Sequence, residues 1–186
     1  MIKEYIYIKN FLKKGLRALI LKKNQIICVI DESYILEILK ILKGSSFSAY
    51  KQLMDIFIVD YPNRRKRFEL NYVLLSVKHS KRMIIKIFVT DKTRVLSVTK
   101  IYSSALWLER ECWDMFGVCF KGNKDLRRIL TDYGFLGHPL RKDFPLTGFV
   151  EVRYDDNLKA IVTEPLELSQ DLRLFDFVSP WIEIGL

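Results

Sequence analysis

Four charged residues stand close together in a stretch that is otherwise apolar. Glu109, Glu111 and Asp114 supply carboxylates and Arg110 supplies a guanidinium, all within residues 103–117. Paired carboxylates can carry general acid–base chemistry, but no serine, threonine or cysteine nucleophile with a recognisable base accompanies them. Arg110 and Asp114 have the four-residue spacing at which opposite charges pair on a helix. We therefore expect ion pairs and no catalytic residue, with Glu109 and Glu111 paired to cations elsewhere in the chain or in another chain.

The cysteines are the other candidate reactive groups. Cys28, Cys112 and Cys119 are scattered and odd in number, which argues against a disulfide framework and favours a reducing compartment. Iron–sulfur and zinc sites need closely spaced thiolates, and no two of these cysteines form a Cys-x-x-Cys pair. We expect core or interface thiols, and neither a metal nor a cofactor bound by this chain.

A histidine and several basic residues follow this charged stretch. His138 lies near Arg141, Lys142 and Asp143, and a redox-linked or proton-relay role is conceivable. Because no second histidine or cysteine lies close to it in the sequence, we favour a structural hydrogen-bonding role.

Arginines are frequent in the same region and could bind phosphate, lipid or protein. For Arg127, Arg128, Arg141 and Arg153 we favour carboxylates of a neighbouring subunit, because a guanidinium matches a carboxylate with two parallel hydrogen bonds. We interpret the basic run at residues 64–67 as a solvated loop.

The elements that would position these side chains follow from hydrophobic periodicity. Short β-branched runs predict strands, and a polar turn between two of them predicts a β-hairpin. Serine and aspartate caps with closing glycines predict helices. The predicted strands are 25–31, 54–60, 68–78 and 83–89, and the predicted helices are 33–44 and 103–116. The result is an α+β domain: a small mixed, largely antiparallel sheet with helices on one face.

The two ends of the chain differ from this central domain, which we place at residues 25–120. Residues 1–24 are basic and amphipathic, as in a transit peptide or an interfacial helix, and we expect a docked helix. No apolar run is long enough to span a membrane. Residues 121–186 lack periodicity and contain many prolines, glycines and aromatics. We predict a long extended arm that becomes ordered along another subunit.

The formal net charge of +9 is compatible with nucleic acid, an anionic membrane or an acidic protein as partner. A basic α+β domain could bind RNA by stacking bases on Phe68 and Tyr72. The same strand carries Leu70, Leu74 and Leu75, as a packed core would. We therefore expect no nucleic-acid partner.

Two neighbouring motifs carry a family resemblance. They read ERECWDMFG at residues 109–117 and LRRILTDYGFLGHPLRKDFPLTG at residues 126–148. They resemble the signature of the 30-kDa subunit family of respiratory complex I, NADH:ubiquinone oxidoreductase, and the resemblance extends more loosely over about residues 26–181. One departure is visible, because the family usually has histidine or lysine where this chain has Asn123.

The resemblance implies a non-catalytic structural subunit of the peripheral arm, in the quinone module, that packs chiefly against the 49-kDa subunit. FMN, iron–sulfur clusters and ubiquinone would be bound by neighbouring subunits. The implied location is the matrix side of the mitochondrial inner membrane, or the cytoplasmic face of a bacterial plasma membrane. Chloroplast-type dehydrogenases and membrane-bound hydrogenases use similar subunits and are alternatives.

Charged and aromatic residues of the two motifs, with Arg153, are our interface candidates. They are Glu109, Arg110, Glu111, Trp113, Asp114, Arg127, Arg128, Tyr133, His138, Arg141, Lys142, Asp143, Phe144 and Arg153.

Overall fold

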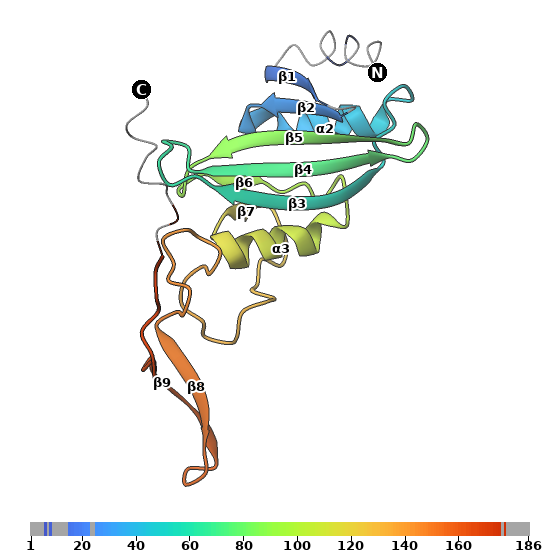
Figure 1. The fold of residues 1–186 in the computed structure, drawn as a ribbon. Coiled ribbons are helices and arrows are strands. Elements are labelled where there is room, and N and C mark those ends of the chain that lie inside the picture. Colours follow the sequence, from blue (N-terminus) through green and yellow to red (C-terminus); the bar gives the residue numbers. More distant parts are fainter. Residues whose placement is uncertain (1–5, 7, 9–14, 23–24, 176, 178–186) are drawn as a thin grey trace, which may run out of the picture. The chain divides into compact units, whose positions relative to one another are not determined.

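A computed structural model describes residues 6, 8, 15–22, 25–175 and 177 (Figure 1). The chain divides into two compact units, Met1–Phe144 and Pro145–Leu186. We call them the first and second units and describe each by itself.

A five-stranded sheet forms the centre of the first unit. Its strands are β1 (Leu16–Lys22), β2 (Gln25–Ile30), β3 (Gln52–Asp60), β4 (Phe68–Ser76) and β5 (Lys81–Val89). Their order is β1-β2-β5-β4-β3, and every neighbouring pair is antiparallel except the parallel pair β2–β5. The predicted mixed, largely antiparallel sheet and its β4–β5 hairpin are therefore confirmed.

Two helices pack with one face of this sheet into a single hydrophobic core. A 3-10 turn, η1 (Glu32–Tyr34), leads into α2 (Ile35–Gly44), and α3 (Ala105–Phe116) lies alongside β3 (Figure 1). Alternate residues of β4 face this core and are fully buried, among them Phe68 and Tyr72. Buried rings cannot stack on bases, so the structure contradicts the RNA-binding alternative as drawn from these two residues.

The prediction of an amino-terminal helix is wrong for residues 16–22. Leu16–Lys22 forms β1, antiparallel to β2, rather than part of a helix. The edge position explains the sequence pattern, because one face of such a strand is solvated and accepts the exposed Arg17 between apolar residues. Ile6 and Ile8 are helical, and the rest of residues 1–14 lies outside the described residues.

The predicted boundary at residue 120 also differs from the observed one. Residues 122–144 belong to the first unit and have little regular structure. They follow a two-stranded parallel pair, β6 (Arg94–Leu96) and β7 (Cys119–Lys121), which periodicity had not indicated. Hydrogen bonds to buried carboxylates take the place of a regular pattern in this segment.

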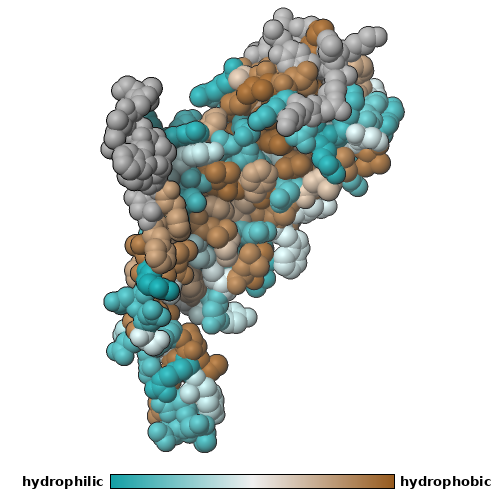
Figure 2. Space-filling model, in the orientation of Figure 1, coloured by the Kyte–Doolittle hydropathy of each residue, from teal (hydrophilic) through white to brown (hydrophobic). Residues whose placement is uncertain are grey.

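The second unit contains a β-hairpin, β8 (Val150–Asp155) and β9 (Ala160–Pro165), where we had predicted only an extended arm. Val150, Val152 and Tyr154 alternate onto one face and are exposed. The opposite face carries Arg153, which pairs with Glu164 across the strands. Figure 2 shows hydrophobic side chains reaching the surface among hydrophilic ones in both units.

None of the helices among the described residues is long and apolar enough to cross a membrane.

Candidate interaction surface

Two of the interface candidates, His138 and Arg141, lie against the carboxyl end of α3. The helix ends at Gly117, which has a φ of 76° and donates its N–H to the Trp113 carbonyl at 2.8 Å. A Cβ at this position would lie 2.5 Å from His138 Nε2 and 2.6 Å from Arg141 Nη2. Glycine is therefore required at this position for two reasons: the left-handed conformation and the close approach of residues 138–141.

Asp114 is the buried hub that organises the loop after the helix. Its carboxylate accepts the backbone N–H groups of Ile129, Leu130 and Thr131 at 3.1, 2.8 and 2.9 Å. The Thr131 hydroxyl at 2.6 Å and Arg128 Nη1 at 2.9 Å complete the set. Burial alone would raise the pKa of Asp114, but these donors together hold it well below its usual range.

The predicted pair between Arg110 and Asp114 does not form. Asp114 is occupied by the loop, and Arg110 instead donates Nε–H to the Arg127 carbonyl at 3.2 Å. Its nearest carboxylate within the described chain is Asp125, with 3.9 Å between Nη1 and Oδ2. The guanidinium lies over the ring of Trp107, 5.0 Å from the centroid.

Glu109 is fully buried, and the cation that we expected to pair with it is not among the described residues of this chain. It accepts hydrogen bonds from the Val98 N–H at 2.7 Å and from the Ser97 hydroxyl and Asn123 Nδ2, each at 2.8 Å. Burial raises the pKa of Glu109, and these three bonds oppose the rise. Asn123, the departure from the family motif, is thus a neutral donor to a buried carboxyl group. Glu111 is exposed.

His138 makes a hydrogen bond of the structural kind that we expected. Its Nδ1–H donates to the Asp114 carbonyl at 2.9 Å, and its ring meets Trp113 edge-on with 5.5 Å between centroids. Burial lowers the pKa of His138, and the nearby Arg141 and Arg128 lower it further.

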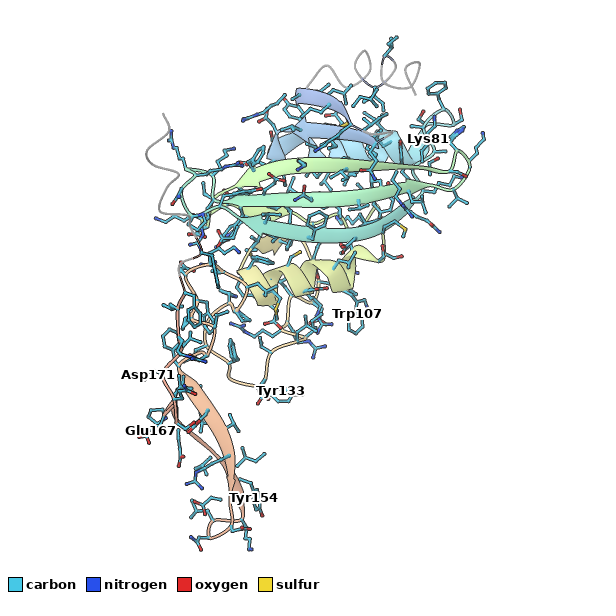
Figure 3. The ribbon with its side chains drawn as sticks, in the orientation of Figure 1. Lys81, Trp107, Tyr133, Tyr154, Glu167 and Asp171 are labelled. Carbon is cyan, nitrogen blue, oxygen red and sulfur yellow. The ribbon has the colours of Figure 1, made fainter. Side chains whose placement is uncertain are left out.

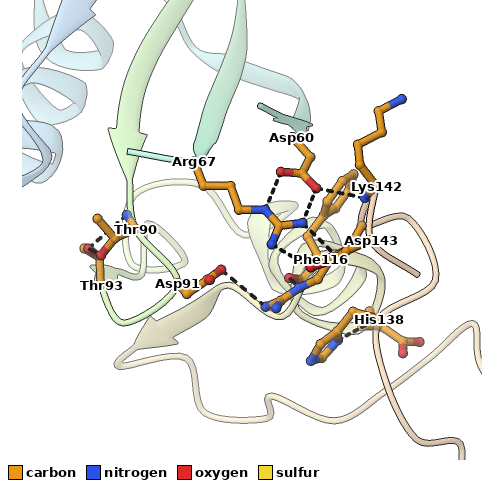
Figure 4. Close-up of polar contacts among 11 residues, drawn as sticks. Asp60, Arg67, Thr90, Asp91, Thr93, Phe116, His138, Lys142 and Asp143 are labelled. Atoms are coloured by element: carbon orange, nitrogen blue, oxygen red, sulfur yellow. Dashed lines mark hydrogen bonds and ion pairs between the residues drawn. The ribbon is translucent and has the colours of Figure 1, made fainter. Parts of the chain in front are cut away.

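A second ion cluster ties residues 142–143 to the sheet (Figure 4). Arg67 donates to both oxygens of Asp60 at 2.6 Å and to both oxygens of Asp143 at 2.8 and 3.0 Å. The Lys142 backbone N–H donates to Asp60 at 2.9 Å. The hydrogen bonds from Arg67 lower the pKa of Asp60. Our interpretation of residues 64–67 as a solvated loop missed the ion pair between Arg67 and Asp60. The available signal in the sequence was an arginine directly before a buried strand.

The motif arginines have partners within the chain, where we had expected a neighbouring subunit's carboxylates. Arg127 pairs with Asp125 at 2.7 Å, and Arg153 pairs with Glu164 at 2.7 Å. Arg141 donates to the Phe116 carbonyl at 2.6 Å and lies 3.7 Å from Asp91. Arg141 thus ties its segment to the end of α3, whereas Arg127 and Arg153 pair within one loop and one hairpin.

The surface beside this network exposes large apolar side chains. Trp107, Leu130, Tyr133, Leu136 and Leu140 are all more than half exposed, and Tyr133 is completely so. Figure 3 shows Trp107 and Tyr133 projecting outward from α3 and from the loop that follows it. Of the predicted candidates, the exposed ones are Glu111, Arg127, Tyr133, Lys142, Asp143 and Arg153. Trp107 was missed, since its place on a largely apolar helix suggested burial.

The described residues contain no group of three potential metal ligands. Burial raises the pKa of the Cys28 thiol to about 12 and that of Cys112 further, so neither is a ready nucleophile.

Sequence comparison gives consistent matches. Residues 28–150 match the family described as "Respiratory-chain NADH dehydrogenase, 30 Kd subunit". The NADH-ubiquinone oxidoreductase subunit 9 of Acanthamoeba castellanii is 50% identical, covering 99% of this chain and 96% of that protein. A subunit of the NADH-quinone oxidoreductase of Paramagnetospirillum magneticum is 55% identical, covering 82% of this chain and 76% of that protein.

Solved structures give matches of the same kind. A trypsin-resistant fragment of Nqo5 is 26% identical with a TM-score of 0.58, covering 68% of this chain and all of the fragment. A chain of an archaeal membrane-bound sulfane sulfur reductase is 28% identical with a TM-score of 0.66. The match covers 78% of this chain and 87% of that chain.

Proposed function

The chain belongs to the family of 30-kDa subunits of respiratory-chain NADH dehydrogenase, and from this membership we propose that it is a non-catalytic core subunit of NADH:ubiquinone oxidoreductase. In this role it helps to build the quinone module of the peripheral arm. The complex transfers electrons from NADH to ubiquinone and pumps protons, while FMN, iron–sulfur clusters and ubiquinone belong to other subunits.

The structural observation that supports a role in assembly is the exposed apolar surface that follows α3. The large side chains of Tyr133 and Leu136 are almost wholly exposed, whereas Arg127 and Arg128 are paired within the chain. Monomeric proteins rarely leave many large apolar side chains together in water, and such a patch marks a binding surface. Burying these side chains against a partner is a main source of binding free energy. A permanent partner therefore accounts for this surface better than a substrate does.

We assign the 49-kDa subunit as the chief partner, and the matrix side of the mitochondrial inner membrane as the location. The relatives named as NADH-ubiquinone and NADH-quinone oxidoreductase subunits, from Acanthamoeba castellanii and Paramagnetospirillum magneticum, support membership in such a complex. The similarity to the sulfane sulfur reductase chain favours one alternative, the equivalent position in another respiratory membrane complex.

The direct test is assembly of the full-length chain in its own membranes. Native electrophoresis with an NADH-dehydrogenase stain, followed by mass spectrometry of the band, should find this chain together with the 49-kDa subunit. Replacing Leu136 by serine should lower the amount of complex and the NADH:quinone activity in parallel, because Leu136 contributes only exposed apolar surface. Val77→Ser, in the turn after β4, is the matched control and should assemble normally.

Two results would contradict the proposal. Absence of the chain from the NADH-dehydrogenase band would remove the assignment to this complex. Full assembly of Leu136→Ser with slow turnover would mean that this region acts in the reaction rather than in assembly.

A further inference from the structure

A groove in the first unit adjoins the Asp114 hub. Its volume is about 590 Å³, and its walls come from α3 and from the loop of residues 127–134. Two exposed aromatic residues, Trp107 and Tyr133, stand at its sides. Three guanidinium groups, those of Arg110, Arg127 and Arg128, also line it.

The three guanidinium groups are not equally satisfied. Arg128 is held by the buried Asp114, and Arg127 takes both oxygens of Asp125 at 2.7 and 3.0 Å. Arg110 is only 7% exposed, yet within the described chain its one hydrogen bond uses Nε, and the nearest carboxylate is 3.9 Å away and already engaged by Arg127. A buried cation without a close anion is costly, so Arg110 is the groove's unsatisfied charge.

The carboxylate within the groove wall does not neutralise Arg110. Asp132 accepts the backbone N–H of Tyr133 at 2.8 Å and forms no ion pair among the described residues. Tryptophan, tyrosine and arginine are the residues that contribute most to protein interfaces, and here all three line a single groove.

We propose that this groove binds an acidic segment of a partner subunit, with one carboxylate seated on Arg110 and the adjoining side chains held between Trp107 and Tyr133. The proposal rests on the proposed function, because it names a contact within the same complex. An incoming carboxylate would give Arg110 the paired hydrogen bonds that Asp125 cannot provide, and the covering chain would exclude water from that pair.

The first test converts this contact into a covalent bond within the assembled complex. The Arg110→Lys variant places a primary amine at the groove, and a zero-length carbodiimide then joins it to any carboxylate in contact. We expect mass spectrometry to find a cross-link from position 110 to an aspartate or glutamate of another subunit. Lys86 and Glu69, 2.6 Å apart in the native chain, provide the control for the reagent. A link from position 110 to Asp125 alone would overturn the proposal.

A second measurement uses the unaltered protein, so it does not depend on the folding of the variant. Hydroxyl-radical footprinting should show oxidation of Trp107 and Tyr133 falling several-fold between the free chain and the complex. Equal oxidation in both states would overturn the groove proposal while leaving the chain in the NADH-dehydrogenase band. Failure of the proposed function would instead remove the chain from that band.

Discussion

At the scale of single residues, buried carboxyl groups are the main determinants of this surface. Asp114 and Glu109 lie on one helix, five residues apart, and both are fully buried, yet their pKa values move in opposite directions. Asp114 accepts hydrogen bonds from one guanidinium, one hydroxyl and three backbone N–H groups. Within the described chain, Glu109 accepts hydrogen bonds from only three neutral donors. The difference comes from the loop segments that supply the donors, and not from the helix itself.

Replacing Asp114 by asparagine should destabilise the chain mainly above pH 4. The folded pKa of Asp114 is below its ordinary value of 3.8. The ionised Asp114 carboxylate therefore makes its full contribution to the free energy of unfolding above that value. This contribution is lost as the pH falls through the folded pKa. We expect a loss of roughly 2–3 kcal/mol at pH 7, typical of hydrogen bonds to a charged group, and a smaller difference in acid. Urea unfolding of both proteins from pH 7 to pH 3 measures it.

Asp156→Asn is the matched control for this experiment, since Asp156 is largely exposed and should change little. A loss that stayed constant down to pH 3 would show that Asp114 is not the ionised hub.

At the scale of elements, the end of α3 sets where the following chain can lie. Gly117 turns the backbone, and the carbonyls of Met115, Phe116 and Asp114 accept donors from Leu140, Arg141 and His138. Residues 138–141 thus cap the helix with a segment more than twenty positions away in the sequence.

Gly117→Ala should destabilise the fold and loosen residues 138–144. The left-handed φ alone costs about 1–2 kcal/mol for a residue with a Cβ. The contacts with His138 and Arg141 add to that cost. We expect a lower melting temperature and faster proteolysis near these residues. Gly44→Ala, where no atom lies within 4 Å of the added Cβ, should leave both unchanged or raise stability slightly. Equal behaviour of the two variants would contradict this account of the turn.

At the scale of the whole molecule, Arg67 holds the last residues before the second unit. Asp143 stands two positions before Pro145, where that unit begins, and Asp60 ends β3. One guanidinium therefore connects the end of the sheet to the end of the first unit.

Arg67→Met should free residues 142–144 from the sheet and leave the Asp60 carboxylate buried without a cation. Breaking a buried pair in this way costs about 3–5 kcal/mol. Limited proteolysis of the full chain should show new cleavage near residues 141–145, and urea unfolding should give the loss in stability. Arg65→Met, at an exposed neighbouring position, is the control. Unchanged cleavage in Arg67→Met would mean that the cluster does not hold this segment.

Local hydrophobic patterns in the sequence predicted most of the helices and strands, but they did not predict which distant side chains pair with one another. The alternation in Phe68–Ser76 and the apolar spacing in Ile35–Gly44 gave the hairpin and α2, because burial of one face imposes a period. The pairing of Arg67 with Asp143 spans 76 positions and leaves no period in the sequence. The i,i+4 spacing of Arg110 and Asp114 was misleading, since several backbone donors compete for the same carboxylate. The Val150, Val152, Tyr154 alternation was visible, but the surrounding prolines and glycines obscured it.

The β8–β9 hairpin has a consequence for the life of the chain in the cell. A two-stranded hairpin is marginally stable in water, and this one leaves Val150, Val152 and Tyr154 exposed on one face. Newly made copies that find no partner therefore present apolar strands with unpaired edges, the features that chaperones and proteases recognise in incomplete proteins. The quantity of this chain should accordingly follow the supply of its partners, so that surplus copies are removed rather than stored.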